Sequence, residues 1–322
     1  RMQSDGVFPD AITFVCVLKA CGSTGTVDMG DHIYEEIVSR GLLEKNLMVG
    51  NALVDMYVKC GMLMKAQKIL NKLPIRDVIS WNGLIAGYAK QGQCHEALDC
   101  FVRMQNEGLS PDVVTFIYIL KACGNTGAID KGKYIHDEIL KTDFLEKDIM
   151  LGTALVDMYT KCSVLGKAKE VLRELPHRDV VTWNTLLAGY TQQGQGVGAL
   201  KCFEDMLSES VSPDDVTFMC VLSACGHSGL LDDAQVLFED MTRKYEISPN
   251  YEHHICMIRA FGRAGYFDKA MSLIKVMPCS DDPSVWLALL GACRKWGNVK
   301  LGKLAFDEVV KLDNTCAGAY VL

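Results

Sequence analysis

Apolar residues recur along this chain at the spacing of an α-helix that buries one face. In the first half of residues 78–112, four apolar side chains stand at i, i+3, i+4 and i+7: Trp81, Leu84, Ile85 and Tyr88. A second stripe follows in the other half: Ala97, Leu98, Phe101 and Met104. Ser80 fits an N-cap and Gly92 a C-cap for the first helix, while Gly108 and Pro111 end the second. The pattern predicts a two-helix hairpin whose apolar face needs a neighbour to cover it.

This hairpin belongs to a pattern that returns after 102 residues. The run Ala52-Leu-Val-Asp-Met-Tyr57 reappears as Ala154-Leu-Val-Asp-Met-Tyr159, and Trp81-Asn82 reappears as Trp183-Asn184. Each block divides into units of 36, 31 and 35 residues. We therefore expect an all-α fold, a right-handed superhelical α-solenoid of stacked helix–turn–helix repeats, with nine hairpins and one continuous core. The expected units are 1–10 (the tail of a preceding unit), 11–46, 47–77, 78–112, 113–148, 149–179, 180–214, 215–250, 251–282, 283–316 and 317–322 (cut short).

Composition narrows the class of protein. The 322 residues are 49% hydrophobic and 23% charged, with a net charge of −7, so a sizeable core is available and disorder is excluded. No run reaches the roughly 18 uninterrupted apolar residues of a membrane span, and we expect no membrane partner. The chain begins at Arg1 without a charged-then-apolar export segment, so we expect a fragment whose targeting signal is absent.

Fourteen cysteines raise the question of disulfides or a metal site. No C-x-x-C occurs, and a chain of this length does not need covalent staples. We interpret the cysteines as small apolar packing residues in a reducing compartment, and we expect no metal and no cofactor.

The unit lengths distinguish two families of helical hairpin arrays. The W-x-x-L-G-x-x-Y signature of the tetratricopeptide repeat is missing. The alternating lengths, the closing Pro-Asp and the opening Val180-Val-Thr-Trp-Asn184 resemble pentatricopeptide repeat proteins, and more narrowly the plant subclass with standard, long and short repeats in triplets. In those terms 11–46, 113–148 and 215–250 are long, 47–77, 149–179 and 251–282 short, 78–112 and 180–214 standard. The tail, with Leu289-Leu-Gly-Ala-Cys293, resembles the extension that follows the last short repeat.

The first helix of each unit carries a second stripe, away from the buried face. Its first position is apolar in most units, and such side chains suit contact with the faces of unstacked bases. The alternative is ordinary packing between repeats. The candidate base-stacking residues are Ile12, Met48, Ile79, Val114, Met150, Val181 and Val216, whereas Glu252 and Ser284 occupy the position in the last two units.

Two further positions carry polar side chains that need hydrogen-bond partners. The next position of the stripe is polar in the short and standard units between residues 47 and 214, and the last residue of each unit up to residue 282 is Asp or Asn, which is also a normal N-cap. The resemblance implies that the two positions form a base-reading pair. The expected pairs are Asn51–Asp77, Asn82–Asp112, Thr153–Asp179 and Asn184–Asp214, with weaker positions at Val15, Asn46, Ile117, Asp148, Met219, Asn250, Ile255 and Asp282.

These pairs predict a base sequence. A carboxylate only accepts hydrogen bonds, so the closing Asp favours bases with an imino N–H, namely U and G. The resemblance implies that Asn at the other position goes with pyrimidines and Thr with purines. From the 47–77 unit the array then reads U, U, unassigned, G and U in the 5′ to 3′ direction, several nucleotides upstream of an edited C.

Cations at the end of the first helix share one register. Lys59, Lys90, Lys161, Arg263 and Lys295 stand there, where they would meet RNA phosphates despite the acidic net charge. A cation at a helix C-terminus is also favourable by itself, by about 0.3–1 kcal/mol. Both interpretations stay open.

Catalytic motifs are incomplete. A zinc deaminase needs H-x-E and P-C-x-x-C; His136-Asp-Glu138 fits the first, but Asp282 replaces the last cysteine after Pro278-Cys279. Gly127-x-x-x-x-Gly132-Lys133 lacks the Ser or Thr of a phosphate loop.

We therefore expect a chain that is not an enzyme and has single-stranded RNA as its partner. The resemblance implies a protein of the mitochondrion or chloroplast that places a cytidine deaminase, as a following domain or with editing accessory proteins, for C-to-U RNA editing. The alternative function is a protein–protein interaction scaffold of the tetratricopeptide type.

Overall fold

A computed structural model describes residues 8–277, 282–313 and 315–321, and within these ranges every regular element is an α-helix. The chain divides into two compact units, 1–164 and 165–322. The division falls between the two helices of the expected 149–179 hairpin, and the single continuous core expected from the sequence stays a prediction. Each unit is described by itself.

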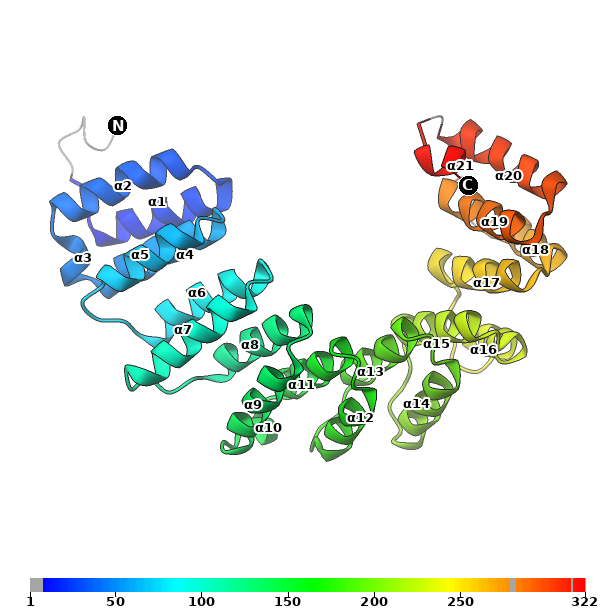
Figure 1. The fold of residues 1–322 in the computed structure, drawn as a ribbon, viewed down its shortest axis with the longest axis horizontal. Helices are drawn as coiled ribbons and strands as arrows, with labels where there is room; N and C mark the ends of the chain where they lie inside the picture. Colours follow the sequence, from blue (N-terminus) through cyan, green and yellow to red (C-terminus); the bar gives the residue numbers. More distant parts are fainter. Residues whose placement is uncertain (1–7, 278–281, 314, 322) are drawn as a thin grey trace. The chain divides into compact units, whose positions relative to one another are not determined.

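The first unit is a two-layer stack of helices. Within each hairpin the two helices pack on each other, and the first helices of successive hairpins also pack in a row, α1 on α4, α4 on α6, α6 on α8 and α8 on α11 (Figure 1). The helices are α1 (Ala11–Thr24), α2 (Val27–Ser39), α3 (Leu42–Lys45), α4 (Leu47–Lys59), α5 (Leu63–Lys72), α6 (Val78–Lys90), α7 (Cys94–Asn106), α8 (Val113–Thr126), α9 (Ile129–Leu140), α10 (Phe144–Lys147) and α11 (Ile149–Lys161).

The second unit repeats this plan. Its first helices form the row α13, α15, α17 and α19, and α14 and α16 each pack against the first helix of the following hairpin. The helices are α12 (Leu165–Glu174), α13 (Val180–Gln192), α14 (Gly196–Ser208), α15 (Asp215–Ser228), α16 (Leu231–Arg243), α17 (Tyr251–Ala264), α18 (Phe267–Val276), α19 (Pro283–Trp296), α20 (Val299–Leu312) and α21 (Ala317–Val321).

The apolar stripes form the cores of these stacks. Trp81, Leu84 and Ile85 are fully buried on α6, and Phe101 and Met104 are fully buried on α7. Burying such side chains contributes about 1.5–3 kcal/mol each. The helical periodicity of the sequence therefore identified the buried faces correctly.

Asp and Asn side chains define where the first helices begin. Asp77 accepts the backbone N–H of Ser80, and the same N-cap geometry recurs at Asp10, Asn46, Asp112, Asp148, Asp179, Asp214, Asn250 and Asp282. The expectation that Ser80 is the N-cap was wrong, because Ser80 stands at the third helical position and returns a hydrogen bond in a capping box. The first helices start at the first residue of each expected unit, while their assignment as long, short or standard repeats stays a prediction.

The two glycines of the apparent phosphate loop have structural roles. Gly127 ends α8 with φ 67°, a left-handed conformation that glycine adopts without strain. A Cβ on Gly132 would lie 2.4 Å from Sδ of Met158, so glycine gives the Met158 side chain its place at the contact between α9 and α11. This arrangement of turn and helix packing leaves no phosphate-binding loop at these residues.

Two four-residue helices were not expected. α3 and α10 follow the second helices of the first two long units, where the sequence reads Leu42-Leu-Glu-Lys45 and Phe144-Leu-Glu-Lys147. A single helical turn is too short to show the 3.6-residue periodicity on which the sequence interpretation relied. No helix in the described part of the chain is long and apolar enough to cross a membrane.

Candidate nucleic-acid interface

A groove in the first unit brings together residues predicted for three different roles. It runs along α4, α6 and α8 and encloses about 470 Å³. Its walls include the base-reading candidates Asn51, Asn82 and Asp112, the stacking candidates Ile79 and Val114, and the cations Lys59 and Lys90. The row of first helices thus gathers side chains that lie up to 63 positions apart in the sequence.

The seven stacking candidates are exposed. Apolar side chains of this size are usually covered by neighbouring repeats, yet these remain between 46% and 69% accessible: Ile12, Met48, Ile79, Val114, Met150, Val181 and Val216. The exposure argues against packing between repeats as their main role. A line of exposed apolar side chains offers surfaces on which bases could stack.

Asn82 and Asp112 form a buried hydrogen-bonded network with Thr115. The Asn82 amide donates to Oδ1 of Asp112 over 2.9 Å, and the Thr115 hydroxyl lies 2.6 Å from Oδ1 of Asn82. The same Asp112 oxygen also accepts the backbone N–H of Thr115 at 2.8 Å. Among the described residues, Oδ2 of Asp112 accepts no hydrogen bond, so the network leaves one carboxylate oxygen for a ligand.

The second unit repeats this network 102 residues later. The Asn184 amide donates to Oδ1 of Asp214 over 2.9 Å, and the Thr217 hydroxyl lies 2.7 Å from Oδ1 of Asn184. Asn82 and Asn184 are 8% and 7% exposed. Agreement between two independent copies shows that the arrangement belongs to the repeat.

The pair in the short unit is held differently. The Asn51 amide lies 3.2 Å from both Oδ1 and Oδ2 of Asp77. Ser80 replaces the threonine, and its hydroxyl donates to the backbone oxygen of Asp77 at 2.7 Å instead of reaching Asn51. Oδ1 of Asn51 is buried without a hydrogen-bond partner. The 47–77 unit therefore holds its asparagine through the amide nitrogen alone.

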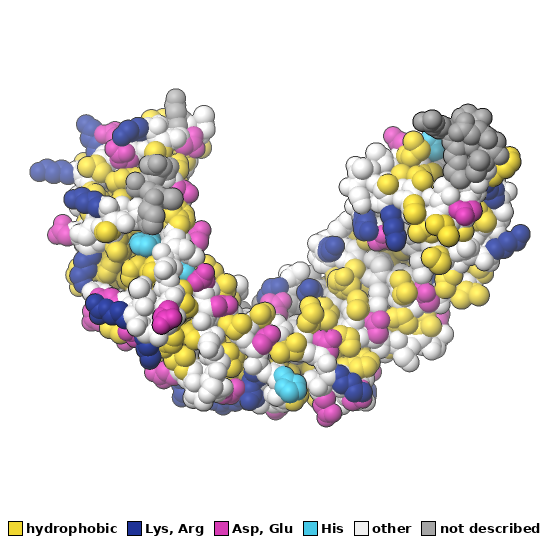
Figure 2. All heavy atoms as spheres, turned by 180° about the vertical axis from the view of Figure 1, so that it is seen from behind, with side chains coloured by type: hydrophobic (Ala, Val, Ile, Leu, Met, Phe, Trp, Pro, Cys, Tyr) yellow, Lys and Arg dark blue, Asp and Glu magenta, His cyan; other side chains and the backbone are white. Residues whose placement is uncertain are grey.

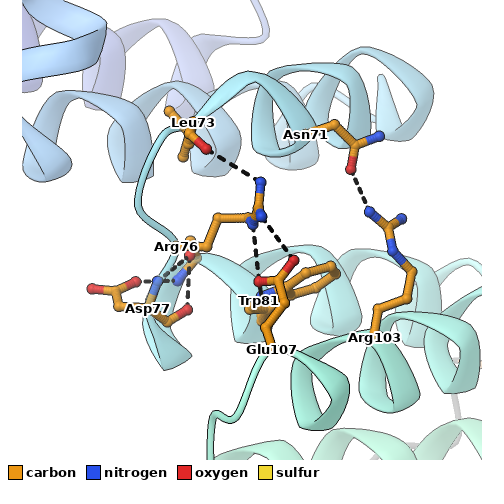
Figure 3. Close-up of polar contacts among 8 residues, drawn as sticks. Asn71, Leu73, Arg76, Asp77, Trp81, Arg103 and Glu107 are labelled. Atoms are coloured by element: carbon orange, nitrogen blue, oxygen red, sulfur yellow. Dashed lines mark hydrogen bonds and ion pairs between the residues drawn. The ribbon is translucent and has the colours of Figure 1, made fainter.

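Arg76 fixes the loop that carries Asp77 by hydrogen bonds and an ion pair (Figure 3). Nε of Arg76 donates to Oε2 of Glu107 over 2.9 Å. Nη1 of the same guanidinium donates to the backbone oxygen of Leu73 over 3.2 Å. The same Glu107 carboxylate accepts the indole N–H of Trp81 at 3.2 Å. These bonds join the loop before α6 to the end of α7. Arg178 and Glu209 repeat the ion pair at 2.6 Å in the second unit.

The remaining predicted pair is divided between the two units. Thr153, on α11, donates its hydroxyl to the backbone oxygen of Ile149 over 3.0 Å. Asp179, in the second unit, caps α13 through Thr182. Their assignment as one base-reading pair stays a prediction.

The weaker positions fall into three groups. Four are the helix N-caps Asn46, Asp148, Asn250 and Asp282. Val15, Ile117 and Met219 are half-buried apolar residues that offer no hydrogen bond. Ile255 is only 4% exposed and lies in the core of the second unit, which leaves little of its side chain for contact with a base.

The predicted phosphate-binding cations differ in their surroundings. Lys59 and Lys161 each form an ion pair one helical turn back, with Asp55 at 2.7 Å and Asp157 at 2.8 Å. Lys90 is exposed and, within the described chain, forms no ion pair. Arg263 is exposed at the end of α17. Figure 2 shows basic and acidic side chains interspersed on the face that it presents, so no large field of one sign covers that face.

Hydrogen bonding determines the ionisation of the reading aspartates. Burial raises the pKa of Asp112, but the Thr115 N–H, the Asn82 amide and the Thr115 hydroxyl outweigh it and hold that pKa below its ordinary value. Asp214 has a lowered pKa for the same reasons, with burial opposed by Thr217 and Asn184. Both side chains are therefore carboxylates at neutral pH and act only as acceptors.

The catalytic motifs do not form a metal site in the described residues. His136 is buried on α9, and its Nδ1 lies 2.9 Å from the Tyr159 hydroxyl. Pro278 and Cys279 lie outside the described residues. Elsewhere in the described chain no group of three or more His, Cys, Asp or Glu side chains could hold a metal ion. The described cysteines are free, and burial raises the pKa of Cys100 and Cys202 to about 12.

The sequence interpretation missed the threonines of the two networks. Thr115 and Thr217 are fully buried and stand outside both helical stripes. The available signal was a Ser or Thr three residues after five of the seven Asp caps, at Thr13, Ser80, Thr115, Thr182 and Thr217, which is the spacing of a capping box. This spacing predicts a local bond to the cap but not the contact with an asparagine of the preceding repeat.

These hairpin stacks and their polar groove define an α-solenoid repeat protein. The PPR repeat family matches residues 76–125 and 178–227, and the PPR repeat matches 51–78, 216–245 and 254–281. Together these matches cover just over half of the chain. The chain belongs to the pentatricopeptide repeat family.

Similar sequences come from Arabidopsis thaliana. One chloroplastic pentatricopeptide repeat-containing protein is 38% identical over 324 residues, covering 100% of this chain and 43% of the relative. The chloroplastic protein CRR2 is 39% identical over 328 residues, with 100% and 50% covered. A putative mitochondrial member is 33% identical over 322 residues, with 100% and 51% covered. The chain thus spans about half the length of the curated relatives it matches.

Solved structures share the fold. The pentatricopeptide repeat protein PPR10 in complex with an 18-nt psaJ RNA element matches with a TM-score of 0.75 at 18% identity, over 97% of this chain and 46% of that one. PPR10 from maize matches with a TM-score of 0.68 at 24% identity, over 99% and 49%. At these identities the similarity shows the solenoid fold.

Proposed function

We propose that this chain binds single-stranded RNA in a sequence-specific manner, one base per repeat. The observation that carries the proposal is the recurrence of the Asn–Asp pair beside exposed apolar side chains. Asn82 with Asp112 and Asn184 with Asp214 make the same bonds in both units. Each pair leaves an amide N–H and a carboxylate oxygen available, which together can hydrogen-bond the edge of a base. The RNA complex of PPR10, which has the same fold, supports this function.

The apolar residues and the cations complete the proposed interface. Ile79 and Val114 flank the reading pair in the groove and would hold a base between them, whereas Lys90 would meet the phosphate. The Asn–Asp pairs at residues 51 and 77, 82 and 112, and 184 and 214 would read U. Thr153 with Asp179 would read G.

The biological role that fits this interface is site recognition in organellar RNA editing. The chain would select the sequence upstream of an edited cytidine and place a deaminase there, either as a domain of a longer protein or as a partner. The triplet pattern of unit lengths supports this subclass. Relatives named chloroplastic and mitochondrial support location in one of these organelles.

A gel-shift panel of short RNAs tests the RNA-binding function. The chain should bind an RNA containing U, U, any base, G and U more tightly than RNAs in which each U is changed to A. The double variant Asn82→Ala and Asn184→Ala should lose this preference while keeping the helical circular dichroism of the unmodified chain. Equal binding to all RNAs, or no binding, would reject the function in favour of a protein scaffold.

A further inference from the structure

We infer that Thr115 and Thr217 are positioning residues that set how strictly Asn82 and Asn184 discriminate between bases. This inference rests on the proposed RNA-binding function. Neither threonine would touch RNA, because both are fully buried beneath the reading pairs. Each would act through the asparagine of the preceding repeat.

The hydroxyl of Thr115 has one proton and two acceptors within reach. Oδ1 of Asn82 lies at 2.6 Å and Oδ1 of Asp112 at 2.8 Å. The Asp112 oxygen already accepts the N–H of Thr115 and the amide of Asn82. Oδ1 of Asn82 accepts no other bond among the described residues, and a buried carbonyl oxygen without a donor is unfavourable. The Thr115 hydroxyl therefore donates its proton to Oδ1 of Asn82.

This bond fixes the orientation of the amide from both ends. Asp112 requires a donor and so takes Nδ2 of Asn82, while Thr115 donates to Oδ1. In the flipped amide, the two oxygens of Asn82 and Asp112 would face each other without a proton between them. The second Nδ2 proton of Asn82 then has no partner among the described residues, whereas Oδ1 already accepts from Thr115, so the side chain offers its donor to the base.

In the 47–77 unit, no threonine hydroxyl holds the side-chain amide of Asn51. Ser80 stands where Thr115 and Thr217 stand in the following units, but its hydroxyl donates to the backbone oxygen of Asp77. Asn51 then lacks a partner for Oδ1, and its amide contacts Asp77 at 3.2 Å instead of 2.9 Å. The asparagine of this pair has more freedom to rotate, so it should distinguish bases less strictly.

The test compares U with C at single nucleotides, because these pyrimidines have the same size and opposite hydrogen-bonding groups. The measured quantity is the ratio of Kd for C to Kd for U at the nucleotide assigned to each pair. Thr115→Val removes the hydroxyl and keeps the shape, and it should lower this ratio about fivefold at the nucleotide of Asn82, as expected for one neutral hydrogen bond. The ratio at the nucleotide of Asn184 should not change.

Thr13→Val is the matched control. Thr13 makes the same bonds to its own cap, Asp10, at 2.8 Å and 2.7 Å, but no asparagine pairs with it in the described chain. Its loss removes a hydroxyl bonded to a helix cap and should change no base ratio. A second readout is the side-chain amide of Asn82 in NMR spectra, whose proton exchange should quicken in Thr115→Val alone.

The outcomes separate this inference from the proposed function. If the unmodified chain shows no preference for U over C at any Asn–Asp nucleotide, the function is wrong and the inference falls with it. If the unmodified chain prefers U but Thr115→Val gives the same ratio, the inference alone is overturned. A smaller ratio at the Asn51 nucleotide than at the Asn82 nucleotide in the unmodified chain supports it, and the opposite order contradicts it.

Discussion

Arg76 binds both carboxylate oxygens of Glu107 across a boundary between repeats, with 2.9 Å from Nε and 2.8 Å from Nη2. The pair is three-quarters buried, and the parallel two-bond geometry is the favourable one for arginine and a carboxylate. It connects the loop that ends in Asp77 to the second helix of the following hairpin. The ion pair therefore fixes the loop of Asp77, a candidate base-reading residue, through a side chain outside the candidate pair.

Removing this clamp should destabilise the chain measurably. Arg76→Ala leaves the partly buried Glu107 without its cation and should lower the free energy of unfolding by about 1–2 kcal/mol. Arg243→Ala is the control, since its ion pair with Glu239 is largely exposed and should contribute less than about 0.5 kcal/mol. Urea denaturation followed by circular dichroism measures both. Equal losses for the two variants would show that the clamp has no special role.

The phosphate contacts should appear in the salt dependence of RNA binding. Lys90 forms no ion pair in the described chain, so Lys90→Ala should weaken binding to every RNA equally and flatten the plot of log K against log salt by about 0.7. The triple variant of Lys59, Lys90 and Lys161 to Ala should flatten it further. Lys72→Ala, on the second helix α5, serves as the control. If the slope is unchanged in the triple variant, these lysines do not contact RNA phosphates and only stabilise the C-terminal ends of their helices.

Asp179→Asn should change which base is read without affecting the fold. Asn caps a helix as well as Asp, so the thermal unfolding of the variant should match that of the unmodified chain. An amide can also donate, and the preference at the nucleotide of Thr153 should move from G toward A by about 1–3 kcal/mol. Fluorescence anisotropy with RNAs that differ only at this nucleotide measures it. Equal affinity of the unmodified chain for G and A would contradict the assignment.

Acid should weaken the folded state through Asp112 and Asp214. Their pKa values lie below the ordinary one in the folded chain, so the unfolded chain binds protons first as the pH falls. The stability that these carboxylates contribute is present in full above about pH 5 and is lost progressively below about pH 4. Asp112→Asn should therefore be less stable than the unmodified chain at pH 7, with the difference shrinking toward pH 3. A constant difference across this range would disprove the linkage.

The isolated chain should bind RNA without converting cytidine. Incubation with an RNA that contains a candidate site, followed by sequencing of its complementary DNA, should show no uridine product with or without added zinc. Detection of uridine would require a deaminase centre within this chain. Lack of conversion together with specific binding fits the role of a site-recognition module.

The sequence predicted the helices and their buried faces because a repeated pattern provides several copies of the same evidence. Trp81 and Trp183 mark the same buried position in both blocks. Single-turn helices and the role of Ser80 were not predicted correctly, because neither depends on periodicity. The ion pairs of Lys59 with Asp55 and Lys161 with Asp157 were visible as i, i+4 spacings. The contact between Thr115 and Asn82 was not visible, since it joins two repeats through a register that only the packed helices define.

The caps at the ends of the repeats have a consequence for how such a protein can change over generations. Aspartate and asparagine both cap a helix well, so exchanging them at a cap such as Asp179 should leave the start of its helix intact. The same exchange alters the groups offered to a base. Under the proposed function, a single nucleotide change in the gene, from an Asp to an Asn codon, would redirect the protein to another transcript at little cost in folding, so that RNA targets could diversify on a constant scaffold.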